Sequence, residues 1–175
     1  MRTFILLASV GLFSVSLFAE SAAGVRWTAP EGWKSGAPRP MRAATYTIAP
    51  APADPGTAEC VVNYFGPGQG GSVDANIERW RGQVQGPGGK PVAAKVAERK
   101  VRGLTITTVD ASGAYSGMGG PTAASPAVVP GHRLLGAIVQ APGGTVFFKL
   151  TGPAKTVAAN AQKFEQLLAS LQLEK

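Results

Sequence analysis

The chain has 175 residues, which at roughly 100–200 residues per domain corresponds to a single domain. Hydrophobic residues make up 45% of it and charged residues only 15%, and this composition excludes a coiled coil and a chain that is disordered throughout. One histidine and one cysteine leave little scope for metal or redox chemistry, and the net charge of +7 favours anionic partners.

The first 23 residues have the pattern of a secretory signal peptide. Arg2 precedes an apolar run over residues 4–19, and small residues then allow cleavage after Ala19 or Ala23. The alternative is an uncleaved anchor, although this run is shorter than the roughly 20 residues that a membrane span requires. We therefore expect export to the periplasm or the exterior, and a single domain over 24–175. Membrane contact is expected only through an uncleaved signal segment.

The first half of the domain predicts strands followed by a helix. Alternation over 41–48 and β-branched and aromatic residues over 59–65 indicate two strands, and the lone Cys60 is expected to be buried in the second. Ser72 can cap the helix that follows. Its apolar face is formed by Val73, Ile77, Trp80 and Val84.

The second half predicts two hairpins and a closing helix. Residues 95–101 and 104–111 form strands about the turn Arg102-Gly103, where glycine supplies a positive φ. Residues 133–141 and 145–151 form the second hairpin.

The stretch 112–131 between the hairpins shows neither helical nor strand periodicity, so we expect a long functional loop there. Pro153 begins the last helix, which carries an apolar stripe. The fold class is therefore α+β, an antiparallel sheet built from hairpins with two packed amphipathic helices.

Three sequence segments carry a resemblance to a known fold: Trp-Thr-Ala-Pro-Glu-Gly-Trp at 27–33, Asn-Ile-Glu-Arg-Trp at 76–80 and Phe-Phe-Lys-Leu-Thr-Gly-Pro at 147–153. With the order of elements over about 25–171, the chain resembles the PsbP-like (Mog/PsbP) fold, including small exported bacterial proteins of that kind. The resemblance implies a non-enzymatic binding or assembly module. The histidines of the PsbP metal site have no match here, and these motifs carry packing and turns, not an activity.

A glycine pattern at 66–71 satisfies G-x-G-x-x-G between a strand and a helix, which is the context of a dinucleotide site. The acidic residue expected about 20 positions later is missing, and the following strands form hairpins instead of a parallel crossover. We interpret the segment as a plain loop before a helix and expect no cofactor.

A small hydrolase is the alternative function. It would use Ser72 or a loop serine with His132, oriented by Asp110. The simpler interpretation makes Ser72 a helix cap. No metal site is expected, because neither His132 nor Cys60 has a second soft ligand.

The predicted partner surface combines the basic hairpin with the long loop. It consists of Lys95, Arg99, Lys100, Arg102, Tyr115 and Met118. A hairpin kept in solution by its charges is the competing interpretation of the basic residues, and Tyr115 and Met118 can equally fold back to cover the edge of the sheet. The lack of interleaved aromatic residues argues against nucleic acid. We expect a non-enzymatic binding module of the cell envelope whose partner is a protein or an anionic envelope component.

Overall fold

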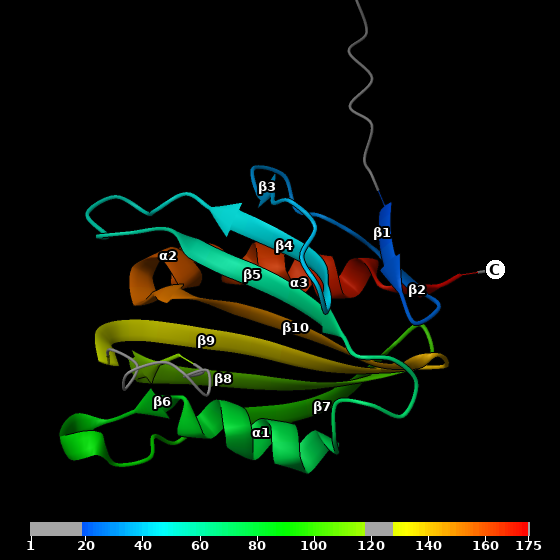
Figure 1. Ribbon diagram of the computed structural model, residues 1–175. Coiled ribbons are helices and arrows are strands. Elements are labelled where there is room, and N and C mark those ends of the chain that lie inside the picture. Colours follow the sequence, from blue (N-terminus) through cyan, green and yellow to red (C-terminus); the bar gives the residue numbers. More distant parts are fainter. Residues whose placement is uncertain (1–18, 118–127, 175) are drawn as a thin grey trace, which may run out of the picture.

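The computed structural model describes residues 19–117 and 128–174, which form antiparallel strands with helices on both sides (Figure 1). The strands are β1 (Ala19–Ala22), β2 (Val25–Thr28), β3 (Lys34–Ser35), β4 (Arg42–Ile48), β5 (Ala58–Tyr64), β6 (Val84–Gln85), β7 (Lys95–Val101), β8 (Leu104–Ser116), β9 (Val128–Ala141), β10 (Gly144–Pro153) and β11 (Gln172–Leu173). The helices are α1 (Val73–Gly82), α2 (Ala154–Ala159) and α3 (Ala161–Ser170), with a short 3-10 turn, η1 (Pro87–Gly89).

The main sheet has the strand order β3-β4-β5-β10-β9-β8-β6, and β7 pairs with β8 beside β6. Its pairings are antiparallel, so the α+β prediction is confirmed. Helices α2 and α3 cover one face, and α1 lies on the other face (Figure 1). The single closing helix of the prediction is divided in two at Asn160.

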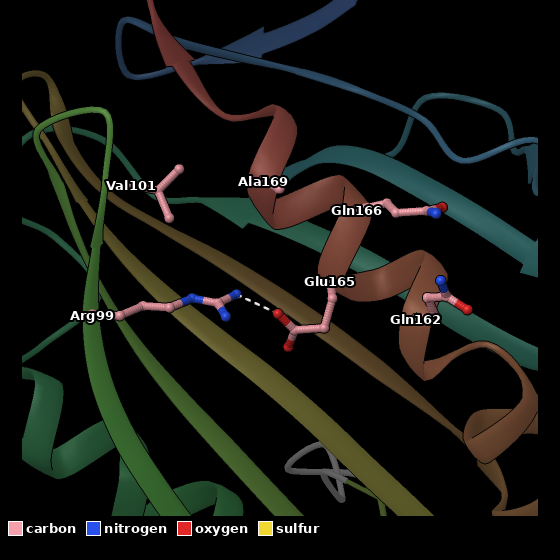
Figure 2. Close-up of a pocket in the computed structure, with 6 residues that line it drawn as sticks. All are labelled: Arg99, Val101, Gln162, Glu165, Gln166 and Ala169. Atoms are coloured by element: carbon pink, nitrogen blue, oxygen red, sulfur yellow. Dashed lines mark hydrogen bonds and ion pairs between the residues drawn. The ribbon is translucent and has the colours of Figure 1, made fainter.

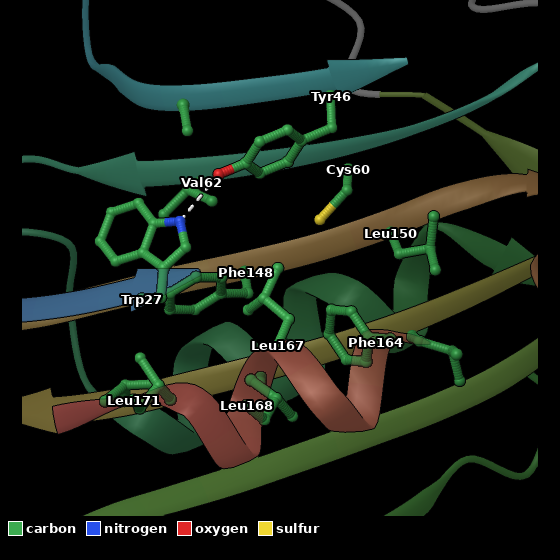
Figure 3. Packing of buried hydrophobic residues seen from close by; sticks show 14 of the residues in the cluster. Trp27, Tyr46, Cys60, Val62, Phe148, Leu150, Phe164, Leu167, Leu168 and Leu171 are labelled. Atoms are coloured by element: carbon green, nitrogen blue, oxygen red, sulfur yellow. Dashed lines mark hydrogen bonds between the residues drawn. The ribbon is translucent and has the colours of Figure 1, made fainter. Parts of the chain in front are cut away.

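The larger core lies between the sheet and α3 (Figure 3). Trp27 packs edge-on against Phe148, with 5.2 Å between the ring centroids. Leu167 and Leu168 of α3 are fully buried against this layer, and so is Cys60 on β5, as predicted. Along each strand, these side chains alternate with side chains that point to the opposite face of the sheet, so every second residue faces the core on the α3 side.

A second cluster lies between the sheet and α1. Trp80 covers Gly136, where an added Cβ would lie 2.3 Å from the indole ring. The prediction that Val84 continues the helix is wrong, because α1 ends at Gly82 and Val84 pairs with Tyr115 in β6. Val84 still packs in the same cluster.

The long loop predicted over 112–131 is also wrong at both ends. Strand β8 continues to Ser116 and β9 begins at Val128. Register pairs such as Ser112 with Arg133 supply the backbone hydrogen bonds. The ends of β8 and β9 are extended because each strand pairs with the other, and the periodicity of the local sequence does not predict such pairing.

The fold begins before Gly24. Strand β1 pairs with β2, and the Glu20 carboxylate accepts a hydrogen bond from the buried Tyr46 hydroxyl. The same hydroxyl accepts from Trp27 Nε1 at 2.8 Å, while β11 pairs with the other edge of β2. Within the described residues, no helix is both long and apolar enough to cross a membrane.

Candidate functional site

A groove runs between the β7–β8 hairpin and α3, and we call it the hairpin–helix groove (Figure 2). One hollow, of about 380 Å³, is lined by Arg99, Val101, Gln162, Glu165, Gln166 and Ala169. A neighbouring hollow of about 350 Å³ shares Gln162 and Glu165 and reaches Lys95. Residues 95, 97, 99 and 101 line the groove because alternate residues of a strand point to the same side.

Two ion pairs cross or border the groove. Arg99 Nη2 lies 2.5 Å from Glu165 Oε2, and both residues line the first hollow (Figure 2). Their side chains are 41% and 52% exposed, so the pair contributes at most about 1 kcal/mol and can open. Arg133 binds Asp110 through two bonds of 2.9 and 2.8 Å. The hydrogen bond to Asp110 raises the pKa of Arg133.

The turn of the hairpin is tied to the end of α3. Arg102 and Gly103 both have positive φ, of 46° and 86°, as the predicted two-residue turn requires. Arg102 Nη1 donates at 3.4 Å to the carbonyls of Ser170 and Leu171. A cation is favoured there, because the last carbonyls of a helix carry partial negative charge.

Two of the predicted basic residues keep their charges unpaired. Lys95 lines the groove, and Lys100 lies on the opposite side of β7. All ten acidic side chains of the chain lie within the described residues, and none forms an ion pair with either lysine. These two lysines are therefore available to an acidic partner.

The rest of the predicted surface is not contiguous with the groove. Tyr115 packs with the α1-side cluster, on the other face of the sheet. Its hydroxyl is near Lys149, and its ring stacks on His132 at 6.2 Å. Met118 lies outside the described residues. The structure thus brings Lys95, Arg99 and Arg102 together along α3 and separates Tyr115 from them.

The residues of the alternative hydrolase do not converge. Ser72 Oγ accepts from Ala75 N at 3.2 Å and caps α1, as the simpler interpretation predicts. Asp110 binds Arg133 and faces α3, whereas His132 stacks on Tyr115 on the α1 side. Among residues 19–117 and 128–174, no group of three or more His, Cys, Asp and Glu side chains could hold a metal ion.

The glycine segment 66–71 forms the loop before α1, and its glycines have local packing roles. A Cβ on Gly70 would lie 2.7 Å from the Phe147 ring. The Gly70 carbonyl accepts from Asn76 Nδ2 at 2.8 Å.

Three charged residues of these surfaces were not predicted from the sequence. Arg133 and Glu165 reach the groove through cross-strand register and helix packing, which leave no local signal. Lys149 did carry a local sequence signal, because it is a lysine inside an otherwise apolar strand over 146–150. A charge at such a position needs either a partner or a function.

Comparison with solved structures identifies the fold. The structure aligns with the solution structure of cyanobacterial PsbP (CyanoP) from Synechocystis sp. PCC 6803, with a TM-score of 0.53 and 12% identity over 95% of this chain and 98% of that one. The chain has the PsbP-like fold. A Pseudomonas aeruginosa protein of unknown function, PA94, aligns with a TM-score of 0.50 and 11% identity over 90% of this chain and 97% of that one.

No family model and no curated protein matches the sequence. At these identities the likeness concerns the PsbP-like fold itself, and any activity must be argued from the surface of this chain.

Proposed function

We propose that the protein is a non-enzymatic binding or assembly module that is exported to the cell envelope and holds an acidic, extended segment of a protein partner along β7 and the hairpin–helix groove. The PsbP-like fold supports a module without turnover, and the signal-peptide pattern of the first 23 residues supports export.

The observation that carries this proposal is the exposed edge of β7. Among the described strands β7 pairs only with β8, and six of its seven residues are exposed. The amide and carbonyl groups of the other edge are therefore available to a further strand. The groove beside β7 offers apolar surface from Val101 and Ala169 to alternate side chains of such a segment.

The charges of this edge select the partner. The strand and its turn carry Lys95, Arg99, Lys100 and Arg102 against the single acidic residue Glu98. Basic segments are repelled, and acidic segments gain favourable pairs with the two free lysines. Opening of the exposed Arg99–Glu165 pair would free a third cation. Binding of this kind weakens as salt screens the charges.

The test is crosslinking of the natively exported protein, with mass spectrometry of the crosslinked peptides. We expect crosslinks from Lys95 and Lys100 to an acidic segment of one stoichiometric partner. Because Lys95→Glu with Lys100→Glu also removes the crosslinked amines, the readout for this pair is co-purification of the partner, which should be lost. The matched control Lys34→Glu with Lys155→Glu, at exposed positions elsewhere, should retain the partner.

Retention of the partner by the first pair of variants would refute the role of the hairpin. Co-purification of a defined small molecule without any protein would refute the assembly function. His132→Ala separates the hydrolase alternative, since only an enzyme that uses this histidine would lose turnover with its fold intact.

A further inference from the structure

Lys149 lies on β10, on the sheet face that α1 covers in part, and it is mostly buried. Its ammonium group donates to Gln83 Oε1 and to Tyr115 OH, both at 3.4 Å. It also lies 6.0 Å from the centre of the Tyr115 ring. These are long contacts for a charge-assisted hydrogen bond, which is ordinarily near 2.7–2.9 Å. One of the three N–H donors of the ammonium is left for a further acceptor.

This ammonium has no carboxylate to balance it. None of the chain's ten acidic side chains, all of them described, forms an ion pair with Lys149. Arg79 on α1 is also without a carboxylate, and its guanidinium donates to Asn76 Oδ1. Arg42 on β4 is already paired with Glu59 on β5 at 2.6 Å. The described groups around Lys149 therefore leave two positive charges uncompensated.

Gln83 gives a second, independent indication of a ligand. It is only 6% exposed, and within the described part of the chain its Nε2 has no hydrogen-bond partner. The amide cannot turn over to resolve this, because its NH2 group would then face the Lys149 ammonium. A buried donor without an acceptor destabilises the folded protein, because it has lost its hydrogen bonds to water and gained none. An oxygen atom of a ligand beside Lys149 would satisfy it.

The electrostatics of these groups favour an anion beside them. Burial lowers the pKa of Lys149 to about 8, with the charges of Arg79 and Arg42 acting in the same direction and Glu59 opposing them. The Tyr115 hydroxyl stays protonated, because burial raises the pKa of that phenol. It can therefore accept from Lys149 and donate to a ligand at once.

We propose that Lys149 Nζ, Tyr115 OH and Gln83 Nε2 form a binding site for a phosphate group. Two uncompensated cations match the charge of a phosphate monoester or of inorganic phosphate more closely than that of a single carboxylate. Several phosphate oxygens can also accept from several donors, whereas a carboxylate has two. The phosphate can be free or part of a lipid headgroup, and the chemistry of recognition is the same.

This site is independent of the hairpin–helix groove. It lies on the α1 face of the sheet, whereas the groove lies on the α3 face. Failure of the phosphate site would therefore leave the proposed partner surface untouched, and the reverse also holds.

The experiment is calorimetric titration with inorganic phosphate at low salt, at a pH above the second ionisation of phosphate and below the pKa of about 8 of Lys149, so that the dianion meets a protonated ammonium. We expect millimolar binding, weakened at least about tenfold by Lys149→Met, which corresponds to about 1.4 kcal/mol. Gln83→Glu should abolish it, because the new carboxylate would pair with Lys149 and repel phosphate. Lys155→Met, at an exposed position on α2, is the matched control and should leave binding unchanged.

Vesicles that contain phosphatidic acid, whose headgroup is a phosphate monoester, and vesicles of phosphatidylcholine alone distinguish the two sources. Binding to the anionic vesicles that depends on Lys149 and is displaced by inorganic phosphate assigns the site to a headgroup, and phosphate binding without vesicle binding assigns it to the free ion. The proposal is overturned if the wild type binds neither probe, if Lys149→Met binds phosphate as the wild type does, or if acetate binds more tightly than phosphate.

Discussion

Replacing Lys149 with methionine should stabilise the protein at neutral pH. The methionine keeps a flexible apolar stem of similar length and removes the ammonium from its mostly buried position on β10. Burial lowers the pKa of this lysine from 10.5 to about 8 in the folded protein. Each unit of pKa corresponds to about 1.4 kcal/mol. At a pH where the lysine is protonated in both the folded and the unfolded protein, its burial therefore lowers the free energy of unfolding of the wild type by about 3 kcal/mol.

The sign of the pH dependence follows from proton linkage. Between pH 8 and 10.5 the unfolded chain binds more protons at Lys149 than the folded chain, so the stability of the wild type rises with pH in this window. The variant has no such group. Its advantage should therefore be largest below pH 8 and should disappear toward pH 10.5. Loss of the two weak hydrogen bonds to Gln83 and Tyr115 reduces the gain by about 1 kcal/mol.

Urea unfolding of both proteins across this pH range measures the difference directly. Groups that both proteins share, such as Cys60 and Tyr46, cancel in the comparison. A variant that is less stable than the wild type at pH 7, or a difference that stays constant between pH 7 and 10, would refute the assignment of Lys149 as an uncompensated buried charge.

Three further predictions concern the fold. Cleavage after Ala23 would remove β1 and leave the buried Tyr46 hydroxyl without its acceptor Glu20. In the export that we propose, the mature chain should therefore begin at Glu20 by intact mass, and a start at residue 24 would contradict this. Gly136→Ala should destabilise the protein by about 1–3 kcal/mol in thermal unfolding, because its methyl group would meet a buried indole of α1, whereas Gly56→Ala, with open space around it, should cost little. Native Cys60 should resist iodoacetamide, since burial raises the pKa of its thiol, and should react once the chain is unfolded in urea; rapid labelling of the native protein would contradict its burial.

Local chemistry made parts of this fold predictable. The Arg102-Gly103 turn and the Ser72 cap each depend on residues adjacent in the chain, and both appear as predicted. The extension of β8 over 112–116 depends on β9 as a partner, so its small residues gave no strand signal. The same applies to the short strand β6, which pairs with the end of β8.

The candidate sites were harder to predict than the fold. Lys95 and Arg99 share a face because strand periodicity dictates it, but the groove needs Glu165 from a helix more than 60 residues away in the chain. The phosphate site draws Gln83, Tyr115 and Lys149 from three separate segments. Periodicity indicates which side of a strand a residue occupies, and tertiary packing decides what it meets there.

The small sheet β1-β2-β11 has a consequence for when the protein can fold. Strand β2 lies between a strand from the beginning of the fold and one from its end, and Arg26 binds Gln172 across 146 residues of sequence. A ribosome must therefore release nearly the whole chain before this sheet can close. Until then Trp27 lacks part of its surroundings, and the nascent polypeptide remains incompletely folded. Such a delay would keep the chain unfolded long enough for the export that we propose, in which a chain passes through a translocation pore before it folds.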